Sequence, residues 1–224
     1  MLDGGSLSIK DKAVLEFGCH SGELGSVLGA LGARVTGVDP DPRAVEAARA
    51  SAARHGLAGR TCFMHVPLTS PLPFDDESFD LISCAGVLQL VRDDLLEHVQ
   101  GELDRVLKPG GQIIVSATAS RPWPREPHHG RWLVNYVPRS LDPIVYGQRT
   151  RRGTWPWRIR SGKLEGYRDM GHEGGGRRIL QSLAREDVSP RGLLLHSVLN
   201  GLLVKRGGHC GNVSPQIAAV LQKP

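Results

Sequence analysis

The stretch Val14-Leu15-Glu16-Phe17-Gly18-Cys19-His20-Ser21-Gly22, followed by Val35-Thr36-Gly37-Val38-Asp39-Pro40, decides the fold of this chain. Each stretch is an apolar run that ends in an acid, and glycines follow the first acid. This order is typical of a βαβ unit, with Glu16 and Asp39 at the carboxyl ends of neighbouring parallel strands. Gly18 and Gly22 let a ligand lie against bare backbone. Asp39 is placed to accept hydrogen bonds from a ribose diol, so the unit predicts a nucleoside-cofactor pocket.

The glycine spacing distinguishes a pyrophosphate-containing dinucleotide from a nucleoside cofactor with a cationic amino acid portion. Pyrophosphate-binding loops carry G-x-G-x-x-G at a helix start, because backbone N–H groups must face a dianion. Here the acid Glu16 precedes the turn, and only Gly18 and Gly22 lie inside it. A carboxylate at this place repels phosphate but suits a ligand with a cationic amino acid portion. The alternative is an ordinary βαβ turn with chance glycines.

Together, the two stretches resemble the first two motifs of class I S-adenosylmethionine-dependent methyltransferases. Three further segments match that family in order, namely Leu72–Ser83, Val87–Val91 and Leu103–Val115, the last with an L-K-P-G-G turn. The resemblance covers residues 12–118, about half of the chain. It implies S-adenosyl-L-methionine as the cofactor. The binding residues it implies are Glu16, Gly18, Cys19, Gly22, Asp39, Pro40, Thr69 and Cys84.

The chain departs from the family pattern at three places. His20 stands where members carry a glycine. The segment Phe63–Thr69 offers no acid for the adenine amine, which leaves backbone groups or Thr69 to recognise the base. Only about ten residues precede the first predicted strand, where many relatives have helices that cover the cofactor. We therefore expect another segment, or a second subunit in a homodimer, to close the pocket.

The predicted fold class is α/β, with a Rossmann-like, seven-stranded, mostly parallel sheet and helices on both faces, in one domain over residues 1–224. Strands are expected near residues 12–17, 34–39, 60–64, 79–84 and 112–118, and helices near 22–31, 41–55 and 92–107. An aspartate of the run Asp39-Pro40-Asp41-Pro42 is expected to cap the second helix, with a proline in its first turn. Gln216–Leu221 is predicted to be an antiparallel edge strand. Leu193–Val204 suits either the sixth strand or a buried helix.

Composition sets further limits. A chain of 224 residues with 40% apolar content is ordinary for one globular domain. No run of 18 apolar residues and no signal pattern are present, so a cytoplasmic location is expected. The four cysteines are scattered without metal spacing and are predicted to be buried free thiols, at Cys19, Cys62, Cys84 and Cys210. No Asp/Asp/Asn cluster indicates a magnesium site, so no metal is expected.

Residues 119–178 differ from the rest of the chain. They hold all four tryptophans and all three tyrosines, and 13 Lys and Arg against 5 Asp and Glu. The other residues carry 15 basic and 18 acidic side chains, so the high pI comes from this segment. It follows the fifth strand and leaves the sheet at the edge where the cofactor is expected. We predict an acceptor-binding insert that caps the pocket; the alternative is a satellite aromatic core with solvated arginines.

Methyl transfer from a sulfonium is an in-line displacement, and an oxygen acceptor usually needs a general base. His128 and His129 are the leading candidates because they follow the fifth strand, and His172 comes next. A neutral amine acceptor needs no base. In that case, Glu126 or Glu165 would hold a cationic substrate.

The resemblance and the insert favour a methyltransferase that acts on a hydroxyl or amine of a small molecule, as in natural-product or sugar-derived intermediates. Basic and aromatic groups also suit nucleic-acid bases, so an RNA methyltransferase is the alternative enzyme. Against it, Ser83-Cys84-Ala85-Gly86 is not the N-P-P-Y type motif of many base amine methylators. Outside the enzymes, the alternative is a catalytically silent partner subunit that binds the cofactor.

Overall fold

The computed structural model describes residues 9–119, 132–133, 135–146, 162–170 and 216–224. Its strands are β1 (Ala13–Phe17), β2 (Arg34–Asp39), β3 (Thr61–His65), β4 (Phe79–Ala85), β5 (Leu107–Ala119), β6 (Arg168–Asp169) and β7 (Gln216–Gln222). The α-helices are α1 (Glu23–Ala30), α2 (Pro42–Arg54), α3 (Asp93–Val106) and α4 (Asp142–Tyr146), and the 3-10 turns are η1 (Arg139–Leu141) and η2 (Gly162–Leu164).

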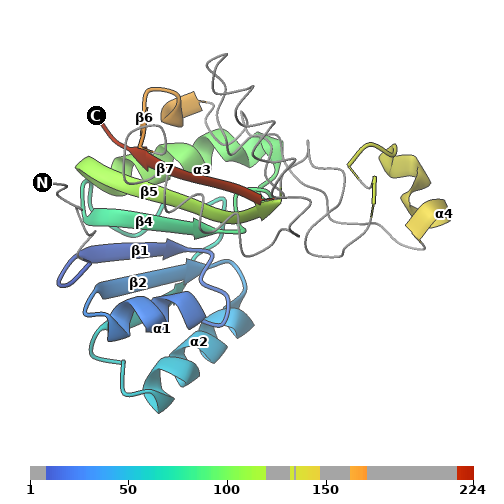
Figure 1. Ribbon diagram of the computed structural model, residues 1–224. Helices are drawn as coiled ribbons and strands as arrows, with labels where there is room; N and C mark the ends of the chain where they lie inside the picture. Colours follow the sequence, from blue (N-terminus) through green and yellow to red (C-terminus); the bar gives the residue numbers. More distant parts are fainter. Residues whose placement is uncertain (1–8, 120–131, 134, 147–161, 171–215) are drawn as a thin grey trace, which may run out of the picture.

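The strands form one seven-stranded sheet in the order β3-β2-β1-β4-β5-β7-β6 (Figure 1). The five strands from β1 to β5 run parallel, and β7 is antiparallel to β5 and β6. The carboxyl ends of β1, β2 and β4 therefore meet at one edge, which we call the carboxyl edge; the opposite one is the amino edge. The predicted Rossmann-like α/β fold is confirmed.

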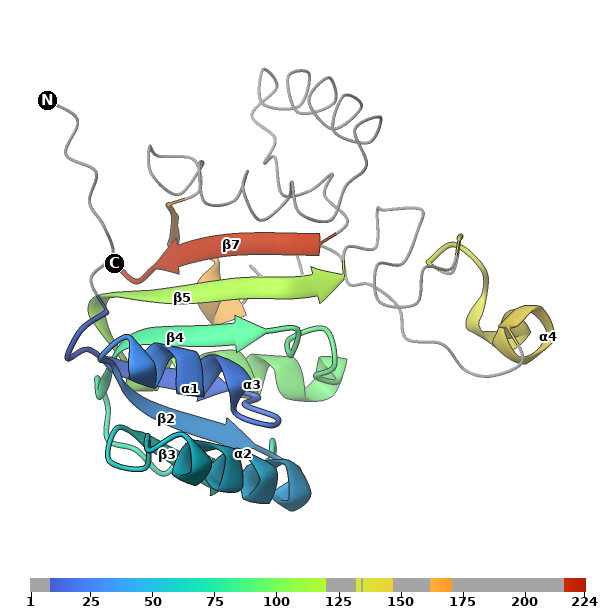
Figure 2. The same cartoon turned by 60° about the horizontal axis from the view of Figure 1, so that its bottom comes forward.

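Helices cover both faces of the sheet because successive strand residues point to opposite sides. Val14 packs with Val35 and with Leu28 of α1, whereas its neighbour Leu15 belongs to a cluster that includes Leu103 of α3. The two views show α1 and α2 on one face and α3 on the other (Figures 1 and 2).

The start of α2 forms as the sequence predicts. The Asp41 carboxylate accepts a hydrogen bond from the Arg43 amide at 2.9 Å, and Pro42 occupies the first turn, where no amide is needed. On the inner side of the helix, Val45 and Ala48 are buried. This helix therefore begins immediately after the acid at the tip of β2.

β5 begins earlier than predicted, because the L-K-P-G-G turn lies inside the strand. Leu107 pairs with Phe79, after which the register shifts. Gly110 has a φ of 72°, and its amide donates to the Lys223 carbonyl at 3.2 Å. The Lys223 amide in turn donates to the Gly111 carbonyl at 2.9 Å. These bonds hold the irregular segment in the sheet, so α3 leads into β5 without an intervening loop.

β7 is antiparallel as predicted, but it is not an edge strand, because β6 pairs with its last residues. Arg168 lies opposite Gln222, which pairs with Gln112 near the start of β5. β6 therefore lies at the amino edge. Tyr167, just before β6, is buried and donates a hydrogen bond to the Asp104 carboxylate of α3 at 2.9 Å. The range 193–204 predicted for the sixth strand or a helix lies outside the described residues.

Candidate functional site

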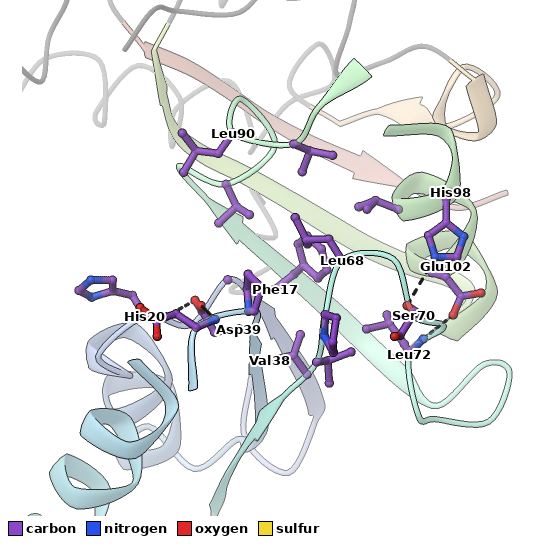
Figure 3. Close-up of a pocket in the computed structure, with 18 of the residues that line it drawn as sticks. Phe17, His20, Val38, Asp39, Leu68, Ser70, Leu72, Leu90, His98 and Glu102 are labelled. Carbon is purple, nitrogen blue, oxygen red and sulfur yellow. Dashed lines mark hydrogen bonds between the residues drawn. The ribbon is translucent and has the colours of Figure 1, made fainter. Parts of the chain in front are cut away.

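A pocket of about 500 Å³ opens at the carboxyl edge and extends between the β3–β4 connection and α3 (Figure 3). Most of its wall is apolar, formed by Phe17, Val38, Val66, Leu68, Leu72, Val87, Leu90, Val91 and Val99. Polar side chains stand at its two ends. His20 and Asp39 lie at one end, and Ser70, His98 and Glu102 lie at the other. This combination of an apolar wall with few polar groups is typical of a small-molecule site.

The carboxylate of Asp39 is held in place by two backbone amides. Its Oδ2 accepts from the His20 amide at 2.9 Å, and its Oδ1 accepts from the Asp41 amide at 2.9 Å. An ionised carboxylate offers about four acceptor positions. Each oxygen therefore keeps a free lone pair for a ligand, such as a ribose diol.

The loop between β1 and α1 is fixed to β2 by backbone bonds. The amides of Gly18 and Cys19 both donate to the Val38 carbonyl, at 2.8 and 3.0 Å. His20 adopts a φ of 44°, in the left-handed region that glycine normally occupies. His20 thus takes a backbone conformation that glycine adopts readily.

The two motif glycines are required by packing within the protein. A Cβ on Gly18 would lie 2.2 Å from Cγ2 of Val87, and Gly18 has a φ of 80°. A Cβ on Gly22 would lie 2.8 Å from the Cβ of Ala48, with a φ of 73°. Both positions are thus closed to larger residues before any ligand binds.

Glu16 is buried, with only 4% of its surface exposed, and its Oε2 has no hydrogen-bond partner in the structure. It lies beneath the first turn of α1, where a Cβ on Gly25 would come within 2.5 Å of Oε2. Burial raises the pKa of Glu16 to about 7, the Gly25 amide opposes this, and the nearby Asp39 charge adds to it. Glu16 is not part of the pocket wall, so its effect on a ligand would be electrostatic.

The cysteines are free in the part of the chain that the structure describes. Cys19 and Cys84 are buried, and burial raises the pKa of each thiol to about 12, so both stay protonated at neutral pH. Cys62 is exposed, contrary to the prediction, because β3 is an edge strand and this residue faces outward. Cys210 lies outside the described residues.

The structure places the predicted cofactor residues in two groups. Gly18, Asp39 and Pro40 line the pocket. Glu16, Cys19, Gly22 and Cys84 are packed behind or beside it, outside its wall. Thr69 is exposed and does not line the pocket, whereas its neighbours Leu68 and Ser70 do.

Most of the residues that we expect to act on the acceptor lie outside the described part of the chain. His128, His129, His172 and Glu126 all lie outside the described residues. Glu165 is exposed beside η2, which packs against α3 near the amino edge. Glu165 does not line the pocket, and its role in holding a cationic substrate stays a prediction.

Sequence reasoning missed the pocket end formed by Ser70, His98 and Glu102. His98 and Glu102 are four residues apart and share one side of α3. They flank the buried Val99, which belongs to the apolar stripe of the helix. Their spacing is the available sequence signal, but a solvated helix face has the same spacing. Contact with the loop around Ser70 became visible only in the folded chain.

A family model described as a methyltransferase domain matches residues 14–111. This range contains β1 to β4, the acid of β2, the pocket wall and α3. Over these residues the chain matches the class I S-adenosylmethionine-dependent methyltransferases. S-adenosylmethionine is the methyl donor that this family implies.

Curated relatives resemble the methyltransferase domain. The methyltransferase YodH of Bacillus subtilis is 36% identical over 119 residues, which cover 51% of this chain and 47% of the relative. A ribosomal protein L11 methyltransferase of Aeromonas salmonicida is 34% identical, covering 64% and 44%. A demethylmenaquinone methyltransferase of Clavibacter sepedonicus is 33% identical, covering 52% and 45%. The chain thus spans less than half the length of these relatives, and the names of the last two state different acceptors.

Solved structures share the fold over a longer range. A S-adenosylmethionine dependent methyltransferase from Mesorhizobium loti is 18% identical, with a TM-score of 0.59, and the alignment covers 97% of this chain and 94% of that chain. The [4+2]-cyclase SpnF is 20% identical, with a TM-score of 0.56 and coverage of 96% and 76%. At these identities, the likeness shows the fold alone. Among the residues placed by the structure, no helix is long and apolar enough to cross a membrane.

Proposed function

We propose that this methyltransferase domain moves a methyl group from S-adenosylmethionine to a hydroxyl or amine of a small molecule, of the kind found among natural-product or sugar-derived intermediates. The observation that carries the proposal is the Asp39 carboxylate. Two backbone amides orient it at the mouth of a 500 Å³ apolar pocket. This is the arrangement that a ribose diol requires.

The electrostatics of the carboxyl edge support a cationic donor. Glu16 and Asp39 interact with each other, and neither takes part in an ion pair in the described part of the chain. S-adenosylmethionine brings a sulfonium and an ammonium group. Their positive charges relieve the repulsion between the two acids, so donor binding favours the ionised form of Glu16.

The acceptor side of the pocket is apolar where the structure describes it. Ala85 ends β4, and Val87 and Leu90 follow it, where a methyl group would have to emerge. Beyond the carboxyl end of β5 lies the segment that carries α4 (Figure 2). Trp132 and Tyr136 of this segment are exposed. These surfaces favour an acceptor with an apolar or aromatic body, and we assign its capture to residues 119–178.

The chemistry needs alignment and water exclusion more than covalent catalysis. The acceptor must approach the methyl carbon in line with the departing sulfur, and a hydroxyl acceptor must lose its proton to a base. His128 and His129 remain our candidates for that base. Replacing either with alanine should slow transfer to oxygen by about 10²–10⁴ without changing donor affinity.

Donor binding and turnover test the proposal together. Calorimetry with S-adenosylmethionine should give binding that the Asp39→Ala variant loses in large part. Incubation with labelled donor and a panel of hydroxyl- and amine-bearing small molecules should then yield methylated product. Transfer to RNA with a steep salt dependence would favour the RNA alternative. Tight donor binding without transfer to either class would favour a silent partner subunit.

A further inference from the structure

The helical stretch formed by η1 and α4 carries an exposed apolar face. Ile144 is 80% exposed and Val145 is 52% exposed, and Leu141 is exposed as well. Spacings of three and four residues place these three side chains on one side of the stretch. We call Leu141, Ile144 and Val145 the α4 patch. Figures 1 and 2 show α4 beyond the carboxyl end of β5, away from the helices that cover the sheet.

The polar side chains of the same segment are buried. Asp142 of α4 is only 1% exposed, and Asn135 is buried too. Both side chains have partners within the structure. Folding thus encloses a carboxylate while its aliphatic neighbours face water. A single exposed aliphatic residue is ordinary, but several of them beside a buried polar group indicate a surface that binds a partner.

The sequence around the α4 patch is strongly basic. Residues 121–160 contain nine arginines against two acids, Glu126 and Asp142, which gives a net charge of +7. Trp132 and Tyr136 are exposed in the same segment, and such amphipathic rings favour the boundary between water and lipid. Apolar, aromatic and cationic groups in one short segment are typical of surfaces that lie on an anionic bilayer.

Two other occupants suit this composition less well. A second copy docked patch to patch would bring two segments of the same positive charge together, and these repel each other. A nucleic acid would attract the arginines and stack on the aromatic rings. It has no use for the exposed aliphatic side chains Ile144 and Val145, which are the most distinctive feature of the patch.

We propose that the α4 patch binds the surface of a membrane that contains anionic lipids. Its aliphatic side chains enter the boundary between headgroups and acyl chains, and the positive charge of the surrounding sequence is attracted to the negative leaflet. Binding of this kind needs no helix that spans the bilayer. The inference goes beyond the proposed function, because it concerns where the protein works and not which molecule it methylates.

Flotation with lipid vesicles tests the proposal on the full chain. The wild type should float with phosphatidylcholine vesicles that contain about one third phosphatidylglycerol, and far less with phosphatidylcholine alone. The double variant Ile144→Ser/Val145→Ser should bind the anionic vesicles about tenfold more weakly or worse, because it loses the apolar area that enters the bilayer. High salt should weaken binding of the wild type by screening.

The matched control removes an exposed aliphatic pair from another surface. Val27 of α1 and Leu31 at its end are 55% and 61% exposed, close to the exposure of Val145. Val27→Ser/Leu31→Ser should therefore bind anionic vesicles as the wild type does. Both double variants should bind S-adenosylhomocysteine with unchanged affinity in calorimetry, which shows that each is folded.

Several results would overturn the proposal. The wild type might bind neither kind of vesicle, or both equally well. The α4 variant might float like the wild type, or the α1 control might lose as much binding as the α4 variant. In each case the patch is not an anionic-membrane surface. Sedimentation would then identify a second copy as the occupant if the α4 variant dissociates a dimer, and an RNA gel shift that the α4 variant weakens would identify a nucleic acid.

Discussion

Acidic side chains at the two edges of the sheet differ in whether they form ion pairs. At the amino edge, two acids meet a base, with Lys108 Nζ 2.7 Å from Asp80 Oδ1 and Arg105 Nη1 2.8 Å from Asp76 Oδ1. At the carboxyl edge, Glu16 and Asp39 have no basic partner in the described residues, although they are close enough to repel each other. The two acids at the amino edge are thus neutralised by bases, whereas the two acids at the tips of β1 and β2 are not paired with a base among the described residues.

The pKa values follow the same division. Burial raises the pKa of Glu16 to about 7. Burial also acts on Asp80, but hydrogen bonds from Lys108 and the Ala13 amide outweigh it, and the pKa of Asp80 is lowered. Paired charges stabilise the fold. The unpaired acids Glu16 and Asp39 lower the stability of the fold but favour binding of a cationic ligand. This difference indicates that the carboxyl edge is a binding site.

The largest effect on stability is expected from a substitution at Gly18, in the loop between β1 and α1. Gly18→Val would place a Cβ 2.2 Å from a methyl of Val87, at a φ of 80°. We expect a loss of about 3 kcal/mol or more in the free energy of unfolding, visible as a lower melting temperature as well as lost donor binding. A milder variant, Gly18→Ala, should also lower the free energy of unfolding. Because the cause is steric, adding Val87→Ala should restore part of that loss. Normal stability of Gly18→Val would contradict the packing described here.

The next largest effect is expected from Asp39, the member of the acidic pair that lines the pocket. Asp39→Ala should weaken S-adenosylmethionine about tenfold to a hundredfold, because charge-assisted bonds to the ribose contribute about 1.5–3 kcal/mol. The variant also leaves the His20 and Asp41 amides without their acceptor, so a smaller loss in stability accompanies it. Asp39→Asn keeps one oxygen acceptor and should lie between the two. Unchanged affinity in calorimetry would remove Asp39 from the site.

The raised pKa of Glu16 predicts how the stability of the fold depends on pH. Its folded pKa of about 7 is above its usual 4.5, so the folded protein binds the extra proton. The stability from this proton is fully present below about pH 4.5 and is lost as pH rises through 7. Glu16→Gln should therefore be more stable than the wild type by about 1–2 kcal/mol at pH 8, with no such gain at pH 4. Denaturant unfolding at both pH values checks this, and parallel curves would rule it out.

The smallest effect is expected at the amino edge. The Lys108 and Asp80 side chains are 42% and 30% exposed, so solvent screens their ion pair. Lys108→Ala should cost no more than about 1 kcal/mol of stability, and less in high salt. Donor affinity should not change. A loss of donor binding here would mean that the two edges are coupled, contrary to their separation by the length of the strands.

Local signals were enough to predict the first half of the chain. Contiguous residues determine the β1–α1–β2 unit, the aspartate cap of α2 and the parallel strands. Their apolar runs, glycines and capping residues can be recognised in the sequence. The position of Asp39 at the pocket follows from the same pattern. The packing contact between Gly18 and Val87 does not, because it joins residues of two different loops.

The rest required contacts between distant segments. Ser70 and His98 are 28 residues apart and meet only because Arg105 and Glu102 bind the loop after β3. The return of the chain to the amino edge at β6 was hidden within a segment whose composition suggested a cap. Two residues of strand are too short to give a periodic signal.

The position of β7 has a consequence for how the protein folds. β1 to β4 can pair with partners that are close in sequence, but β7 joins β5 across about a hundred residues. Closing so long a loop has an entropic cost that local contacts do not offset, and this slows folding. We expect the parallel strands to form first, leaving one side of β5 unpaired until residues 216–222 dock. Pulsed hydrogen exchange during refolding should show protection of β1 and β4 before protection of β7.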